Sequence, residues 1–166
     1  MFIGREAELA FLKEKYEEER GQLVVLYGRR RVGKTETLRE FCKGKPHVFF
    51  SCTQCADKVQ LGRFSKQLLK ENIPAAQYIS EFSDWEKAFR AILELPYGDK
   101  KKLIIVDEFP YMCKGNAAIP SILQNLWDEA LKDSNVMIIL CGSAMSFIEK
   151  ELLAENDLKF KNLFLE

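Results

Sequence analysis

The chain has 166 residues, the length of one typical domain, and its 25 Lys and Arg residues balance 25 Asp and Glu residues. Zero net charge argues against a generic basic nucleic-acid coat and against a polyanionic tail. The composition, 47% hydrophobic and 30% charged, is typical of a folded globular chain. No apolar run approaches the roughly 18 residues that span a bilayer, and residues 1–8 carry no secretory signal. We therefore expect a cytoplasmic protein with one domain over residues 1–166.

Short apolar runs alternate with helical patterns along the chain. Ser83 and Glu86 form a capping box, which predicts that a helix begins there. In chain order we predict a helix over 6–19, a strand over 23–27, a helix over 34–42, a strand over 47–51, a helix over 58–71, a helix from 83, a strand over 103–106, a helix over 120–132, a strand over 136–140, a helix over 146–153 and a strand over 158–165.

The predicted strands are apolar throughout, so they need cover on both faces. Strands that alternate with helices form right-handed crossovers and a parallel sheet. We therefore predict a three-layer α/β fold with a mainly parallel five-stranded sheet. Ligands bind such sheets at the carboxyl ends of the strands, and the informative polar residues follow the apolar runs.

Residues 28–35, Gly-Arg-Arg-Arg-Val-Gly-Lys-Thr, match the phosphate-binding pattern G-x-x-x-x-G-K-[ST] between a predicted strand and a predicted helix. The backbone amides and the helix N-terminus would hold phosphates, Lys34 would reach the β- and γ-phosphates, and the Thr35 hydroxyl would bind Mg²⁺. The three arginines would raise the positive potential around a triphosphate, or form a solvated loop face. The predicted nucleotide-binding residues here are Gly28, Arg29, Arg30, Arg31, Val32, Gly33, Lys34, Thr35 and Glu36.

An acidic pair, Asp107 and Glu108, follows the apolar run 103–106. Asp107 would hold Mg²⁺, and Glu108 would orient or deprotonate the attacking water, which favours an ATPase over a small-molecule kinase. Alternatively, Glu108 caps the next turn or pairs with a surface lysine. The separation of the loop from Asp107 predicts that the strand of Asp107 lies next to the strand of the loop.

Ser143 follows the strand predicted over 136–140. It would lie beside Asp107 on the neighbouring strand and bond the water or the γ-phosphate, or it would cap the following helix. The predicted catalytic residues are thus Glu108, Lys34 and Ser143.

Cysteines and lysines offer two further motifs. Cys52 and Cys55 form a lone C-x-x-C, but no second ligand pair completes a zinc site, so free thiols are favoured over a structural or redox pair. Residues 100–102, Lys-Lys-Lys, are interpreted as a solvated turn, and they are also, with the arginine loop, the only sequence support for nucleic-acid binding.

Four stretches together resemble the archaeal ATPase family, which is related to the AAA+ and STAND groups of P-loop ATPases. They are Phe-Ile-Gly-Arg-Glu at 2–6, the loop with its preceding Leu-Tyr at 26–35, Leu-Ile-Ile-Val-Asp-Glu-Phe-Pro-Tyr at 103–111, and Cys-Gly-Ser at 141–143. The resemblance implies a P-loop NTPase fold with its five-stranded sheet and an ATP·Mg²⁺-binding core. It also implies an adenine contact around Ile3 and Arg5, and a sensor role for Ser143.

The sequence also departs from this family. Members usually continue with a Pro-Leu-Tyr-Gly-Arg-like segment and a helical lid or winged-helix domain, whereas residues 153–160 run as Leu-Ala-Glu-Asn-Asp-Leu-Lys-Phe. We expect an ATPase core that acts as a nucleotide-driven switch or motor module with a protein partner or effector domain. The alternatives are a nucleotide-binding module with negligible hydrolysis and a DNA-associated ATPase.

Overall fold

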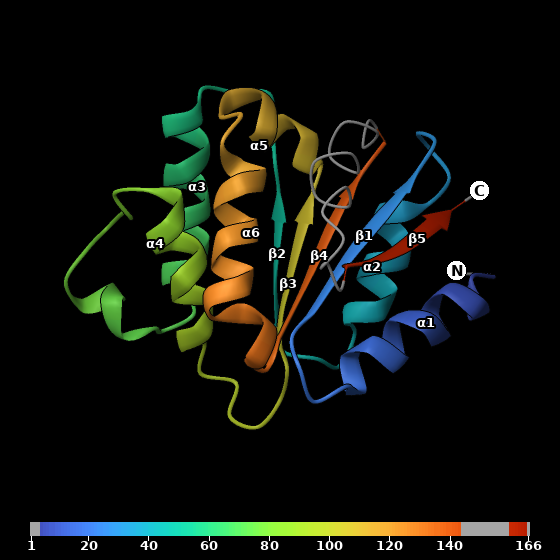
Figure 1. The fold of residues 1–166 in the computed structure, drawn as a ribbon. Coiled ribbons are helices and arrows are strands. Elements are labelled where there is room, and N and C mark those ends of the chain that lie inside the picture. Colours follow the sequence, from blue (N-terminus) through green and yellow to red (C-terminus); the bar gives the residue numbers. More distant parts are fainter. Residues whose placement is uncertain (1–3, 144–159, 166) are drawn as a thin grey trace.

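The computed structural model describes residues 4–143 and the backbone of residues 160–165. In this part of the chain, five parallel strands form one sheet in the order β2-β3-β4-β1-β5 (Figure 1). The strands are β1 (Gln22–Gly28), β2 (His47–Ser51), β3 (Lys102–Asp107), β4 (Val136–Gly142) and β5 (Phe160–Leu165). The predicted helix over 146–153 lies outside the described residues.

The described residues also form six α-helices and three 3₁₀ segments. The helices are α1 (Glu6–Glu17), α2 (Lys34–Cys42), α3 (Asp57–Leu69), α4 (Trp85–Arg90), α5 (Phe109–Gly115) and α6 (Ile119–Glu129). The 3₁₀ segments are η1 (Pro74–Gln77), η2 (Ala91–Glu94) and η3 (Leu131–Asp133). Among these helices, none is long and apolar enough to cross a membrane.

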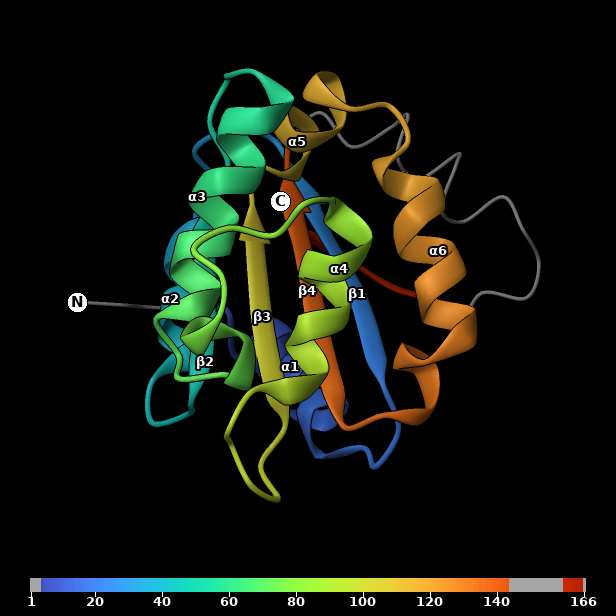
Figure 2. The same cartoon turned by 90° about the vertical axis from the view of Figure 1, so that its left-hand side faces the viewer.

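The sheet has a helical layer on each face, as predicted. Side chains of β1 alternate between two cores: Leu23 and Val25 pack with α3, α4, α5 and α6, whereas Val24 and Leu26 pack with α1 and α2. Figure 2 views the sheet through the first of these layers, with α3, α4 and α6 in front and α1 and α2 behind. Burial of both faces explains why the strands carry no polar alternation.

The predicted position of the Asp107 strand is wrong in one respect. We expected β3 to lie next to β1, but β4 separates them, pairing with β1 through Leu26 and Cys141 and with β3 through Val106 and Leu140. The predicted pairing of the Ser143 strand with the Asp107 strand is confirmed. Both β3 and β4 are buried on both faces, so their apolar pattern does not tell which of them is beside β1.

The start of α4 also differs from the prediction. The N-cap is Asp84, whose carboxylate accepts a 2.8 Å hydrogen bond from the Lys87 backbone N–H, and not Ser83. Asp is among the preferred N-cap residues, and its negative charge is favourable at a helix N-terminus.

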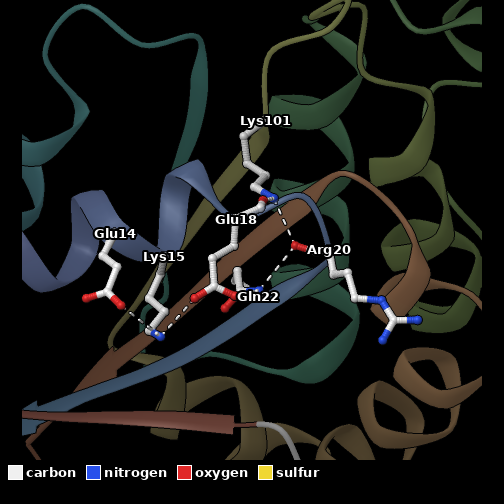
Figure 3. Close-up of polar contacts among 6 residues, drawn as sticks. All are labelled: Glu14, Lys15, Glu18, Arg20, Gln22 and Lys101. Carbon is white, nitrogen blue, oxygen red and sulfur yellow. Dashed lines mark hydrogen bonds and ion pairs between the residues drawn. The ribbon is translucent and has the colours of Figure 1, made fainter.

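Lys101 joins two connections at the amino ends of the strands (Figure 3). Lys101 was predicted to be solvated, but only 3% of its surface is exposed. The ammonium donates a hydrogen bond to the Glu18 carbonyl and a 2.9 Å bond to the Arg20 carbonyl, both between α1 and β1. Burial lowers the pKa of Lys101, and the charge of Glu18 opposes that shift. The interpretation of residues 100–102 as a wholly solvated turn is therefore wrong.

All five cysteines are free in the structure. Four are buried and Cys55 is partly exposed. Burial raises the pKa of Cys42 to about 11, which keeps its thiol protonated and unreactive.

Candidate functional site

The glycine-rich loop, residues 28–35, connects β1 to α2 at the carboxyl edge of the sheet. Gly33 adopts φ 92°, which favours glycine, immediately before α2 begins at Lys34. The buried Lys34 ammonium donates hydrogen bonds to the carbonyls of Gly28 at 2.9 Å and Arg29 at 2.6 Å. The loop thus folds around its own lysine.

The Asp107 carboxylate lies against the first turn of α2. Asp107 is 5% exposed, and its carboxylate accepts a 2.7 Å hydrogen bond from the hydroxyl of Thr35. Thr35 lies 72 positions earlier in the chain. The other oxygen of the Asp107 carboxylate accepts a 2.9 Å bond from the Glu108 backbone N–H. Both oxygens are therefore oriented by neighbours, and the Thr35 hydroxyl and the Asp107 carboxylate form one local set of oxygen ligands.

Cys141 of β4 lies close to this carboxylate. Burial raises the pKa of the Cys141 thiol well above its usual range, and the negative charge of Asp107 and a hydrogen bond to it raise it further. The raised pKa keeps the Cys141 thiol neutral, so it adds no charge next to Asp107.

A cavity of about 610 Å³ opens over the loop, within the usual range for ligand sites. It unites three segments that are distant in sequence: the loop and the first turn of α2, the start of α5, and the end of β4. Its lining residues are Arg30, Arg31, Gly33, Lys34, Thr35, Glu36, Glu108, Tyr111 and Ser143.

Most of the predicted site residues thus meet at one cavity. Gly28, Arg29, Val32 and Asp107 do not line it, although Gly28 and Arg29 bind Lys34 and Asp107 binds Thr35. Arg5 does not line the cavity, but it donates a hydrogen bond to the Val32 carbonyl of the loop and pairs with Glu8 at 3.3 Å. Ile3 lies outside the described residues.

Sequence reasoning missed Tyr111 as a lining residue. It lies in the first turn of α5, where its backbone N–H donates a 3.0 Å bond to the Glu108 carbonyl. Pro110, at the start of α5, was the available signal for this helix. A helix beginning after Glu108 would have placed Tyr111 on the turn that faces the cavity.

The oxygen pair suits Mg²⁺ better than a metal that needs a protein cage. Among the described residues, no three His, Cys, Asp or Glu side chains are grouped to hold an ion. Mg²⁺ is usually held by one or two carboxylates together with substrate phosphates and water. Thr35, which lines the cavity, and Asp107, which accepts its hydrogen bond, fit that requirement.

The family model for an ATPase domain found predominantly in Archaea matches residues 2–162. An uncharacterised protein of Methanocaldococcus jannaschii is 30% identical over 154 residues, which are 93% of this chain and 32% of that protein. An uncharacterised ATP-binding protein of the same organism is 49% identical over 45 residues, or 27% of this chain and 76% of that protein.

Solved structures share the fold. A Walker-type ATPase of Pyrococcus abyssi has a TM-score of 0.71 at 20% identity, covering 99% of this chain and 53% of that chain. Cdc6p of Pyrobaculum aerophilum has a TM-score of 0.63 at 18% identity, covering 98% of this chain and 45% of that chain. The chain spans about a third of the first curated relative and about half of these structures. By its match over nearly the whole sequence, the chain belongs to the family of ATPase domains found predominantly in Archaea.

Proposed function

We propose that this chain binds ATP with Mg²⁺ and hydrolyses it to ADP and phosphate. The observation that carries the proposal is the 2.7 Å bond between the Thr35 hydroxyl and the Asp107 carboxylate, at the edge of a cavity that Lys34, Glu108 and Ser143 also line. These are the groups that phosphoryl transfer to water requires: a cation for the phosphates, oxygen ligands for a metal and an acid for the water.

Each residue has a separate task in the proposed reaction. Lys34 exchanges the carbonyls of Gly28 and Arg29 for phosphate oxygens, while Thr35 and Asp107 would hold Mg²⁺. The bound Mg²⁺ would neutralise charge on the β- and γ-phosphates. Glu108 takes a proton from the attacking water, and Ser143 orients that water or the γ-phosphate.

We assign the adenine side of the site to the segment around Ile3 and Arg5. Support comes from the family resemblance and from the hydrogen bond of Arg5 to the Val32 carbonyl, which holds Arg5 beside the loop. Competitive binding of ATP and GTP tests this assignment, and we expect the chain to prefer ATP.

The biological use we propose is a cytoplasmic switch or motor module, in which the nucleotide state is passed to a further domain or a protein partner. The greater length of the relatives supports this coupling. Two DNA-bound structures share the fold, one of Drosophila ORC and one of an Aeropyrum pernix Orc1 protein. Burial of Lys101 takes one of the three consecutive lysines away from any DNA contact, so a DNA-associated role is the weaker alternative.

The decisive experiment titrates Mg²⁺·ATP into the purified chain calorimetrically and follows phosphate release in the same sample. Lys34→Ala should abolish measurable binding, because the ammonium that meets the phosphates is lost. Glu108→Gln should keep the affinity within a few fold and lower turnover about 10²–10⁴-fold, the usual contribution of a general base.

Other results would contradict the proposal in different ways. Absence of ATP binding by the wild-type chain would refute the site itself. Binding without phosphate release would refute hydrolysis and leave a nucleotide-holding module, the alternative kept from the sequence. Transfer of phosphate to a metabolite without net release would indicate a small-molecule kinase.

A further inference from the structure

Unusual backbone conformations gather around the glycine-rich loop. Within the described residues, four residues other than glycine have a positive φ: Arg5 at 67°, Arg31 at 64°, Asn72 at 60° and Glu108 at 54°. Three of them belong to the loop or contact its surroundings, whereas Asn72 lies between α3 and η1 and does not line the cavity. A positive φ is uncommon for a residue with a Cβ and easiest for Asn. Backbone strain of this kind concentrates at functional sites.

Arg31 combines this strain with a place in the cavity wall. Its residue is exposed and lines the cavity with Lys34, Glu108 and Ser143. Among the residues that the structure describes, no side chain or carbonyl forms a hydrogen bond or ion pair with the Arg31 guanidinium. Within the described part of the chain, a permanently charged, planar donor group therefore lines the cavity without a protein partner.

The other two loop arginines differ from Arg31. Arg29 does not line the cavity, and its carbonyl binds Lys34. Arg30 lines the cavity, but its φ is not positive. Glycine would adopt the conformation of residue 31 at no steric cost, whereas an arginine in that conformation carries one.

We propose that Arg31, which the loop of the same chain supplies, is a catalytic residue that stabilises the γ-phosphoryl group during its transfer. This role rests on the proposed ATP hydrolysis. The water oxygen bonds to the γ-phosphorus as the bond to the β,γ-bridging oxygen breaks. The bond's electron pair leaves with ADP, and the proton of the water passes to the Glu108 carboxylate. Negative charge accumulates on the γ-phosphoryl oxygens and the leaving oxygen, where a guanidinium can donate two parallel hydrogen bonds.

This role separates Arg31 from Lys34. The Lys34 ammonium is held at the base of the loop by two carbonyls and serves ground-state phosphate binding. Arg31 stabilises charge that develops only during transfer, so its loss should lower turnover far more than ADP affinity. A site of this kind would not need an arginine from a second subunit.

The test compares Arg31→Gly with Asn72→Gly. Both variants place glycine at a positive φ, but only the first removes a side chain from the cavity. The measurements are single-turnover phosphate release from Mg²⁺·ATP, calorimetric affinity for Mg²⁺·ADP with and without aluminium fluoride, and the melting temperature. Aluminium fluoride with ADP imitates the planar phosphoryl group.

We expect Arg31→Gly to lower turnover about 10³-fold or more, the contribution of an arginine in this position in other phosphoryl-transfer enzymes. Its affinity for ADP alone should stay within about threefold, its affinity for ADP with aluminium fluoride should fall by a factor comparable to the loss of turnover, and its melting temperature should not fall. Asn72→Gly should keep wild-type turnover. A merely structural role of Arg31 would instead lower the melting temperature and leave the fluoride-dependent affinity unchanged.

Three results would overturn the assignment. Turnover of Arg31→Gly within twofold of the wild type would remove Arg31 from the reaction while leaving the proposed hydrolysis intact. An equal loss of affinity for ADP with and without aluminium fluoride would make Arg31 a general nucleotide-binding residue. A wild-type chain that releases no phosphate would refute the proposed hydrolysis itself, and the role of Arg31 with it.

Discussion

Replacing Lys101 by methionine removes an ammonium that ties the α1–β1 connection to the start of β3 (Figure 3). Methionine keeps most of the aliphatic stem, so little cavity is created and the change is largely confined to the hydrogen bonds. Two hydrogen bonds from a charged donor contribute about 3–6 kcal/mol in total. Desolvation of the ammonium, which lowers the pKa of Lys101, offsets part of that gain. We therefore expect a loss of about 3 kcal/mol in the free energy of unfolding.

Urea denaturation at neutral pH measures this loss, with the slope of the free energy against urea unchanged. The matched control is Lys100→Met, which alters the exposed neighbour and should stay within about 0.5 kcal/mol of the wild type. Equal stability of the two variants would refute the reasoning, because it would mean that the buried ammonium contributes no more than a solvated one.

Three further predictions concern stability. Gly21→Ala should cost about 2–3 kcal/mol in urea denaturation, because a Cβ at residue 21 would lie 2.2 Å from the backbone oxygen of Leu131. Asp84→Ala should cost about 1 kcal/mol through loss of the N-cap bond to the Lys87 N–H. Burial raises the pKa of Cys42 to about 11 from an ordinary value near 9, so its contribution to stability is complete below pH 9 and is lost as the pH rises towards 11; Cys42→Ala should make the alkaline decline of the melting temperature shallower.

Each of these has an outcome that contradicts it. Gly21→Ala with wild-type stability would mean that η3 can shift away from the α1–β1 connection at no cost. A larger loss of stability for Ser83→Ala than for Asp84→Ala would mean that Ser83, and not Asp84, is the N-cap of α4. Identical alkaline unfolding of the wild type and Cys42→Ala would remove Cys42 from the pH dependence.

The sequence predicted best what is encoded locally. The helix over 34–42 and the strand over 47–51 agree with α2 and β2 to the residue, because the Gly-Lys-Thr motif and short apolar runs mark those boundaries. The meeting of Lys34, Glu108 and Ser143 followed from one rule, that the carboxyl ends of parallel strands share an edge.

Errors arose where the determining partner is distant in sequence. Lys101 looks like its exposed neighbour Lys100, and its burial depends on carbonyls of residues 18 and 20, more than 80 positions earlier. The order of β3 and β4 beside β1 depends on how crossovers pack, which two equally apolar strands do not reveal. Tyr111 was missed because the short helix α5 was not predicted.

The position of β4 between β1 and β3 has a consequence for how the protein is made. During synthesis β1 emerges early, yet its partner β4 begins about 108 residues later. At about 5–20 residues per second, translation leaves β1 without this neighbour for roughly 5–20 s. Throughout that time its run of Leu23 to Leu26, fully buried in the folded chain, is available to other nascent chains. Pairing over such a sequence distance is also slow in refolding, so the Thr35–Asp107 contact, which needs β3 held in place by β4, should be among the last to form.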